Sequence, residues 1–511
     1  MVFCYGLTDV SGRQARIMYA QRHPHRNIPS EKIFARLFQR LAETGPFTAR
    51  TTDRGRPCNV RTPEMEERML KHLECDPQTS VRRNAAAEGI NQALEWMELL
   101  GLVVAVIIFV SECCAQDSLA SLKRYEGFRE ALFNAFRTQP GNKAQHFRRA
   151  TELNKMQLSV PLQKAFPCST ENSRSPIRPT TVHQLRPGDI DVIGAIGDSL
   201  TASWGNDALN LGAVLVDNRG SSWSIGGEKT WREYLTLPNI LKEFNPNLIG
   251  YSYGDSLSHQ KDSQFNVAEA VAMSRDIHFQ ARNLWKRMRG DSRVDFKKDW
   301  KVVTLMIGPN DFCLDMCYVK NAGKLPENHR QDLISTLDFL RDNMPRTVVN
   351  LVMVPDLEIL MNFTAKPQRC QILHSIECPC LLGLAYQHRR QHFLDIMRQW
   401  RQVEMEVANS DRYRTKDDFA VVLQPFAQNA TLPTVEKGAE QVTDYSFLSF
   451  DCFHFSQKTN ALVANALWNN MLEPVGHKST DWEPLFTKFM CPTQQQPYIF
   501  TAGNSGPKDD S

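Results

Sequence analysis

One serine, one histidine and one aspartate occupy positions in this sequence that suit nucleophilic acyl transfer. Ser199 ends the apolar run "DVIGAIGDS", and the later segment "SFDCFHFS" places Asp451 three residues before His454. A serine hydroxyl attacks well only when a base accepts its proton, and His454 is the best candidate for that base. Asp451 could accept the imidazole Nδ1–H and so fix the tautomer of His454. An isolated D-x-x-H motif is more often a capped turn before a helix, so this interpretation depends on other groups that the chemistry requires.

Acyl transfer also requires donors for the charge that develops on the substrate oxygen, and each donor is worth about 3 kcal/mol of barrier. The backbone N–H of Ser199 is one candidate. The segment "SSWSIGG" supplies glycines, whose backbone can approach a substrate closely, and we favour Gly226 over Gly227. The segment "IGPNDF" supplies the side-chain amide of Asn310, although Pro, Asn and Asp are also common in turns.

The elements that must position these residues begin near residue 186, where apolar, β-branched runs alternate with helical stretches. This alternation predicts an α/β fold with a mostly parallel sheet covered on both faces. Catalytic groups in such folds gather at the carboxyl ends of the strands, where Ser199, Asn310 and the 451–454 segment would lie. The expected strands are 190–197, 213–218, 248–254, 301–308, 348–355 and 419–426, and the expected helices are 265–290, 328–343, 384–409 and 457–472.

The motifs GDSL, SxxxGG, GPND and DxxH follow one another in this order, and the chain thereby resembles the GDSL or SGNH hydrolases. The phrases "RPTTVHQLRPGDIDVIGAIGDSLTASWG", "DWKVVTLMIGPNDFC" and "DCFHFS" are similar to the membrane-associated, repeat-containing phospholipase B type, over most of residues 165–500. The resemblance implies a three-layer α/β/α, flavodoxin-like SGNH hydrolase fold. It also implies serine esterase activity on glycerophospholipids, both as a phospholipase and as a lysophospholipase.

The same resemblance implies roles for individual residues. Ser199 would be the nucleophile, and Asp451 and His454 would complete the triad. Gly226 and Asn310 would join the Ser199 N–H in the oxyanion hole. No metal or cofactor is implied. Two further residues would support these motifs, namely Asp198 and Gly227.

We therefore expect a metal-independent, monomeric esterase that acts through an acyl-enzyme on phospholipid or lysophospholipid at a membrane or micelle surface. Pocket shape would decide between this substrate and the first alternative, a general carboxylesterase or neutral-lipid esterase. The second alternative is a DNA-binding protein led by residues 1–95, and the third is a catalytically inactive lipid-binding module. A net charge of +3 is too close to neutral to favour a nucleic-acid or membrane role for the chain as a whole.

The N-terminal part has the composition of a separate, small all-α module. Residues 1–95 are expected to form helices broken by turns. The segments "RHPHRNIPSEKIF", "RLAETGPF", "DRGRP" and "VRTPEMEERML" resemble the helix-turn-helix region of transposon-derived proteins, which implies an ancestral DNA-binding role. The alternative is a solvated helical pair whose arginines only confer solubility.

An apolar segment at 97–115 follows this module. Its run from Leu99 to Val110 is shorter than a membrane span of about 20 residues, and it has the length of a signal-peptide core with a possible cleavage position after Ala115. A positive n-region is missing, and a buried core helix is the alternative. We expect Met97 to start a secreted, soluble enzyme, with one repeat, no membrane anchor and no nucleic-acid partner for the mature protein.

We expect the rest of the chain to divide into a helical lead-in at 116–185, the SGNH hydrolase domain that the resemblance implies at 186–492, and a polar tail at 493–511. The lead-in looks like basic amphipathic helices, which would be a propeptide, a lipid-surface element or a solvated prelude to the core. Asn362 and Asn429 begin N-x-T triplets and would be glycosylation acceptors if the domain is secreted.

The cysteines after residue 116 are even in number, as a disulfide framework in an oxidising compartment requires. Zinc is the alternative for four of them, but a C-x-C pair is tight for one ion. We expect disulfides, whose connectivity the spacing does not reveal. The cysteines concerned are Cys168, Cys313, Cys317, Cys370, Cys378, Cys380, Cys452 and Cys491.

Overall fold

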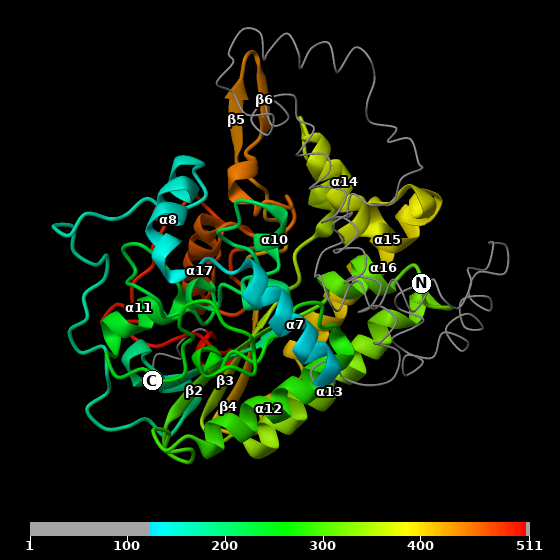
Figure 1. Ribbon diagram of the computed structural model, residues 1–511. Helices are drawn as coiled ribbons and strands as arrows, with labels where there is room; N and C mark the ends of the chain where they lie inside the picture. Colours follow the sequence, from blue (N-terminus) through cyan, green and yellow to red (C-terminus); the bar gives the residue numbers. More distant parts are fainter. Residues whose placement is uncertain (1–122, 507–511) are drawn as a thin grey trace, which may run out of the picture. The chain divides into compact units, whose positions relative to one another are not determined.

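The computed structural model describes residues 123–506, all of which belong to one compact unit, Cys113–Ser511 (Figure 1). The predictions for the helix-turn-helix-like module at 1–95, for the apolar segment at 97–115 and for the last residues of the tail lie outside the described residues. In the part that is described, no helix is both long and apolar enough to cross a membrane.

A parallel β-sheet of four strands forms the centre of the described structure. The strands lie side by side in chain order: β1 (Ile190–Gly197), β2 (Trp300–Met306), β3 (Thr347–Val352) and β4 (Phe419–Gln424). Nearly all of their side chains are buried, as expected for a parallel sheet that is covered on both faces. The first, fourth, fifth and sixth of the predicted strands are therefore confirmed.

The predicted strand at 213–218 is wrong. Its first residues belong to a short helix, α10 (Leu211–Val214), which Asn210 caps through a side-chain hydrogen bond to a backbone N–H. Its later residues contribute an isolated antiparallel bridge between Trp204 and Asp217. The run is buried throughout, and a short buried apolar run fits a helical turn as well as it fits a strand.

The predicted strand at 248–254 is wrong as well. Ile249 forms an isolated parallel bridge with Val192 on the outer side of β1. Gly250 and Gly254 then have φ values of +105° and +48°, which turn the backbone out of the extended conformation. The glycines in this run therefore override its apolar and aromatic pattern.

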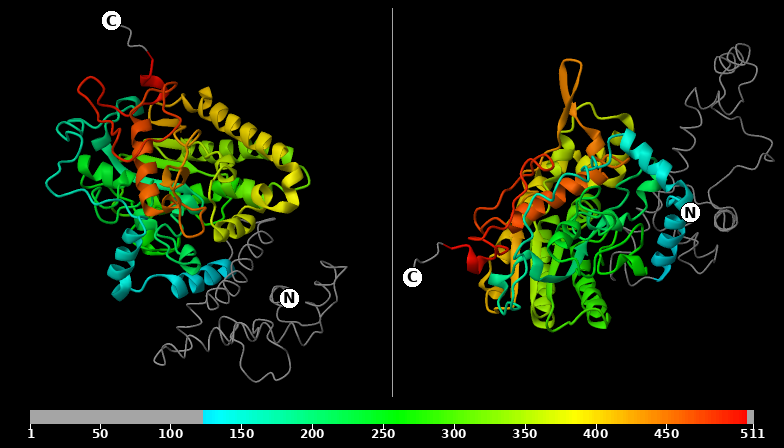
Figure 2. Two further views of the ribbon diagram at one scale, coloured as in Figure 1. Left: turned by 90° about the horizontal axis from the view of Figure 1, so that it is seen from above. Right: turned by 90° about the vertical axis from the view of Figure 1, so that its left-hand side faces the viewer.

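Helices cover both faces of the sheet (Figure 2). On one face, α12 (Ile277–Gly290), α13 (Leu325–Asn343) and α16 (Arg390–Ala408) pack side by side. On the other face lie α11 (Leu237–Phe244) and α17 (Gln457–Met471). The four predicted helices are confirmed, although the first begins later than expected. The arrangement confirms the three-layer α/β/α fold.

The lead-in contains two helices, as predicted: α7 (Lys123–Phe136) and α8 (Lys143–Glu152). Phe133 on α7 is fully buried. The Arg129 guanidinium is also buried and lies 2.5 Å from the Asp217 carboxylate. This face of α7 is therefore packed against the rest of the described unit and is not solvated.

Shorter elements surround the carboxyl edge of the sheet. α9 (Ser199–Ala202) follows β1 directly. A hairpin of β5 (Thr434–Lys437) and β6 (Glu440–Thr443) rises at the top of Figure 1, and α14 (Gln368–Glu377) rises at the same end of the molecule. α15 (Pro379–Leu382) comes immediately after α14.

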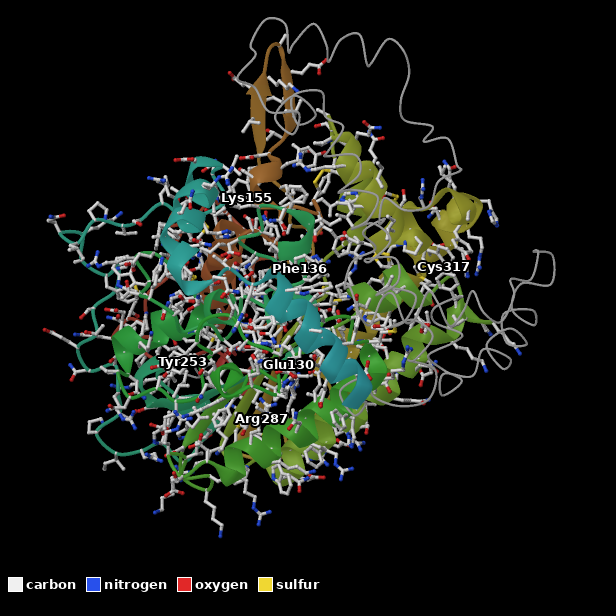
Figure 3. All side chains as sticks on the ribbon, in the orientation of Figure 1. Glu130, Phe136, Lys155, Tyr253, Arg287 and Cys317 are labelled. Carbon is white, nitrogen blue, oxygen red and sulfur yellow. A yellow bond between two sulfur atoms is a disulfide. The ribbon has the colours of Figure 1, made fainter. Side chains whose placement is uncertain are left out.

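Four disulfides join distant parts of the described chain, which confirms the predicted disulfide framework and shows that the zinc alternative is wrong. Cys317, labelled beside α15 in Figure 3, is one of the eight bonded residues. Among residues 123–506, no cluster of three or more His, Cys, Asp or Glu residues could hold a metal ion. The pairs are Cys168–Cys491, Cys313–Cys378, Cys317–Cys380 and Cys370–Cys452.

Replacing Arg129 by Leu tests whether the lead-in stabilises the domain that contains the sheet. The Asp217 carboxylate would keep its contact with Arg219 but lose a buried cation, and removing one member of a buried ion pair costs about 3 kcal/mol or more. The midpoint of unfolding in guanidinium should therefore fall. The matched control is Glu130→Gln, at an exposed position on the same helix (Figure 3), which should leave the midpoint unchanged. Equal midpoints for Arg129→Leu and the wild type would contradict this account.

Candidate active site

Ser199 lies where β1 passes directly into α9. Asp198 caps this helix, because its Oδ1 accepts the Leu200 N–H at 2.9 Å. A Cβ atom at Gly197 would lie 2.6 Å from the carbonyl oxygen of Met306 on β2, so a larger residue does not fit there. The sequence Gly-Asp-Ser therefore forms a close turn that presents the serine at the carboxyl edge of the sheet.

The three residues predicted to form a triad come together in the structure. His454 Nε2 lies 2.9 Å from Ser199 Oγ, and His454 Nδ1 lies 2.6 Å from Asp451 Oδ2. The carboxylate can accept only from an Nδ1–H, which leaves Nε2 of the neutral ring as an acceptor for the serine proton. All three residues are buried, with exposed fractions of 5% for Ser199, 0% for Asp451 and 4% for His454.

Asp451 is ionised although it is fully buried. Burial alone would raise the pKa of this carboxyl group, but the His454 imidazole and two backbone N–H donors lower the pKa below its ordinary value. Those donors are the N–H groups of Phe453, at 2.9 Å, and of His454, at 3.0 Å. The carboxylate can therefore stabilise the imidazolium that forms when His454 accepts a proton.

Asp198 has the opposite electrostatic character. It is fully buried, and burial raises the pKa of its carboxyl group to about 7. The hydrogen bond from the Leu200 N–H and the nearby His454 oppose this shift without cancelling it. A group of this kind supports the turn as a cap, which agrees with the supporting role expected for it.

Asn310 follows β2 and lies close to the same edge of the sheet. Its Nδ2 donates to the Ala272 carbonyl oxygen at 2.9 Å, which fixes the orientation of the amide. A carboxamide carries two N–H donors, so the second remains for a substrate oxygen. The Ser199 N–H is a further candidate donor, because the first N–H groups of a helix have no acceptor within the helix.

The two glycines of the SxxxGG motif have other partners. The Gly226 N–H donates to the Ser222 carbonyl oxygen at 2.8 Å, and the Gly227 N–H donates to the Ser252 carbonyl oxygen at 2.9 Å. A Cβ atom at Gly226 would lie 2.5 Å from the Gly220 carbonyl oxygen, so close packing of the loop accounts for this glycine. The oxyanion role of Gly226 stays a prediction, and it requires sharing of an N–H that is already bonded.

An apolar pocket of about 50 Å³ adjoins the triad and was not foreseen from the sequence. Three lining residues are the chain neighbours of site residues: Leu200 follows Ser199, Pro309 precedes Asn310 and Phe453 precedes His454. Residues from three further parts of the chain complete the pocket wall. Their positions in the sequence do not indicate that they meet beside Ser199 and His454. They include Leu357, Ile359, Leu360, Phe363, Leu432 and Trp482.

Trp204 is a second neighbour of the site that sequence reasoning missed. Its ring packs edge-on against the His454 imidazole, with a centroid distance of 5.2 Å, and the Arg129 guanidinium lies over the same indole at 5.2 Å. The lead-in helix is thereby connected through Trp204 to His454. The two predicted glycosylation acceptors, Asn362 and Asn429, are exposed at the surface, and their modification stays a prediction.

Residues 193–467 match the family described as GDSL-like Lipase/Acylhydrolase, and this segment contains all three residues of the triad. The chain belongs to this family. The GDSL-like assignment agrees with the serine-containing turn after β1 and with the parallel sheet beneath it.

Curated relatives of this GDSL-like chain carry the name "Phospholipase B1, membrane-associated". The chain is 40% identical to the Mus musculus protein over 367 residues, which are 70% of this chain and 24% of that protein. It is 39% identical to the Homo sapiens protein over 340 residues, which are 66% of this chain and 23% of that protein. The chain thus spans about a quarter of the length of these relatives.

The raised pKa of Asp198 predicts a pH-dependent stability for this GDSL-like hydrolase. The folded-state pKa of about 7 lies above the ordinary value of 3.8, so ionisation of Asp198 lowers the free energy of unfolding. This loss is absent below pH 3.8, grows as the pH rises and is constant above about pH 7. Asp198→Asn removes this cost and keeps an oxygen that can accept the Leu200 N–H. In urea unfolding, the variant should gain more stability over the wild type at about pH 8 than at about pH 5. The same gain at both pH values would contradict the raised pKa.

Proposed function

We propose that this chain is a serine esterase that removes acyl chains from phospholipids and lysophospholipids. The observation that carries the proposal is the hydrogen-bonded series Asp451–His454–Ser199 beside an apolar pocket. The names of the curated relatives support the phospholipid substrate. The four disulfides support an extracellular location, because disulfides persist in oxidising compartments.

The proposed reaction has two halves. Ser199 Oγ attacks the acyl carbonyl carbon while His454 Nε2 accepts the hydroxyl proton, and Asp451 stabilises the resulting imidazolium. The Ser199 N–H and the Asn310 amide donate to the oxyanion of the tetrahedral intermediate. The ester bond then breaks, and the leaving alcohol, a lysophospholipid or a glycerophosphodiester, takes the proton from His454. In the second half, His454 removes a proton from water, which attacks the acyl carbonyl carbon of the acyl-enzyme. The bond to Ser199 Oγ then breaks, His454 returns the proton to Ser199 Oγ, and the fatty acid leaves.

The pocket is proposed to hold the acyl chain. It adjoins the nucleophile and its lining is almost entirely apolar, with Asp356 as the one carboxylate among the lining residues. Apolar lining favours a hydrocarbon chain over the charged head group, which would lie towards solvent. We also propose a monomer whose partner is a membrane or micelle surface, without nucleic acid.

Ser199→Ala tests the nucleophile with phosphatidylcholine that carries two distinguishable acyl chains. Wild-type protein should release fatty acid in the presence of a chelator, and Ser199→Ala should lose at least about 1,000-fold in kcat. Ser335→Ala, at an exposed position on α13, is the matched control and should keep full activity. Cleavage of triacylglycerol or short esters without cleavage of phospholipid would identify the general or neutral-lipid esterase instead. Folded protein that cleaves none of these would overturn the esterase proposal.

Leu360→Trp tests the acyl pocket. Leu360 lines the pocket, so the larger indole should occupy the space that a long acyl chain needs. We expect kcat/KM for a long-chain ester to fall about 10-fold or more, while an acetyl ester changes less than about 3-fold. The acetyl ester serves as the control for folding and for the triad. A parallel fall for both esters would show that this pocket does not hold the acyl chain.

A further inference from the structure

The segment that carries the acid and the base of the triad is a closed loop. Leu448 and Phe455 form an antiparallel bridge at its base, and the Ser449 N–H donates to the His454 carbonyl oxygen at 2.7 Å. At its tip, Cys452 has a φ of +62°, in the left-handed region that L side chains rarely adopt. Such a conformation persists only where its surroundings hold it. The base of the loop is therefore fixed by its own backbone. At the tip, the Cys452 N–H donates to the Ser449 carbonyl oxygen at 3.2 Å, and the unfavourable φ of Cys452 calls for a further restraint from outside the loop.

α14 supplies that restraint. Cys370 on this helix forms a disulfide with Cys452. One turn further along, His374 Nε2 donates to the Cys452 carbonyl oxygen at 2.7 Å. Cys370 and His374 are four residues apart, so they share one face of the helix, and both are buried against the loop. A covalent bond and a hydrogen bond thus converge on the tip, and the Arg369 guanidinium lies over the Phe450 ring beside it, 5.3 Å from the ring centroid.

The α14 residues near the loop include one cation, Arg369, and two buried titratable groups, His374 and Glu377. Burial lowers the pKa of His374, which is therefore a neutral donor. Burial, together with the nearby Asp451 carboxylate, raises the pKa of Glu377 well above its ordinary value. The His374 contact therefore adds no charge that competes with His454 for Asp451.

We propose that α14 positions the acid and the base of the triad. The Cys370–Cys452 disulfide and the His374 hydrogen bond hold the loop tip in its left-handed conformation. That conformation directs the Asp451 carboxylate towards the His454 imidazole, and through it towards the nucleophile. The three residues that hold the tip are positioning residues, because they act through the loop. The inference rests on the proposed function, since it concerns the same site.

Two disulfide variants test the proposal. In Cys370→Ala/Cys452→Ala the tip loses its covalent restraint, and kcat on a water-soluble acetyl ester should fall about 100-fold, since a displacement of about 1 Å costs that much in a positioned site. KM should change less than about 3-fold. The matched control is Cys168→Ala/Cys491→Ala, which opens a longer loop, with a sequence separation of 323 against 82 residues, away from the triad. Its loss of stability should be at least as large, yet its kcat should stay within about 2-fold.

Further variants keep the test valid if the double alanine variant does not fold. Glycine adopts a positive φ without steric cost, so Cys370→Ala/Cys452→Gly should fold more stably than the double alanine variant. Its kcat should nevertheless stay low, because glycine does not hold the tip in place. At the neighbouring contact, His374→Gln keeps an N–H donor and should retain most of the activity, whereas His374→Leu should lose it.

A readout without substrate separates this inference from the proposed function. The proton between His454 Nδ1 and Asp451 Oδ2, which lie 2.6 Å apart, should give a strongly downfield ¹H signal. The signal should be present in the wild type and in Cys168→Ala/Cys491→Ala, and absent from the variants that release the tip. Wild-type protein that shows the signal but hydrolyses no ester would overturn the proposed function alone. Equal kcat and equal signals in the two disulfide variants would overturn the positioning role of α14.

Discussion

The candidate site depends on one buried pair, the Asp451 carboxylate and the His454 imidazole. A carboxylate with no exposure to water is stable only if it is paired, and here the imidazole and two backbone N–H groups keep its pKa low. In return, the carboxylate fixes the ring so that Nε2 lies 2.9 Å from Ser199 Oγ. Each partner therefore sets the state of the other, and the rest of the fold has to bring this pair to the serine.

The sheet alone does not achieve this. β1 and β4 are the two edges of the four-stranded sheet, about 14 Å apart at the usual strand spacing. Ser199 follows β1, whereas Asp451 and His454 come after β4. The chain after β4 must therefore cross the carboxyl edge. Contacts with the turn after Ser199 hold it there: Ser449 Oγ donates to the Gly205 carbonyl oxygen at 2.5 Å, and the Gln457 N–H donates to the Asn206 carbonyl oxygen at 2.8 Å.

The order of the motifs made the candidate triad and the α/β fold predictable, because GDSL and GPND each follow an apolar run that forms a strand and DxxH comes after the last strand of the sheet. The spacing of apolar residues predicted the wrong element where every residue of a run is buried, as at 213–218. It also predicted the wrong element where glycines with positive φ interrupt an extended run, as at Gly250. It also could not reveal that Cys452 bonds to Cys370, since many pairings of eight cysteines satisfy the same count. The pocket and the contact of Trp204 with His454 arise from chain segments that meet only after folding.

The most direct test of this account is covalent labelling of the folded protein with a fluorophosphonate, followed by mass spectrometry of its peptides. A phosphonate reacts with a serine only when a neighbouring base activates the hydroxyl. We expect one label per chain, on the peptide that contains Ser199, and loss of all esterase activity in proportion to labelling. A label on another serine, or ester hydrolysis that persists after Ser199 is fully labelled, would contradict the account.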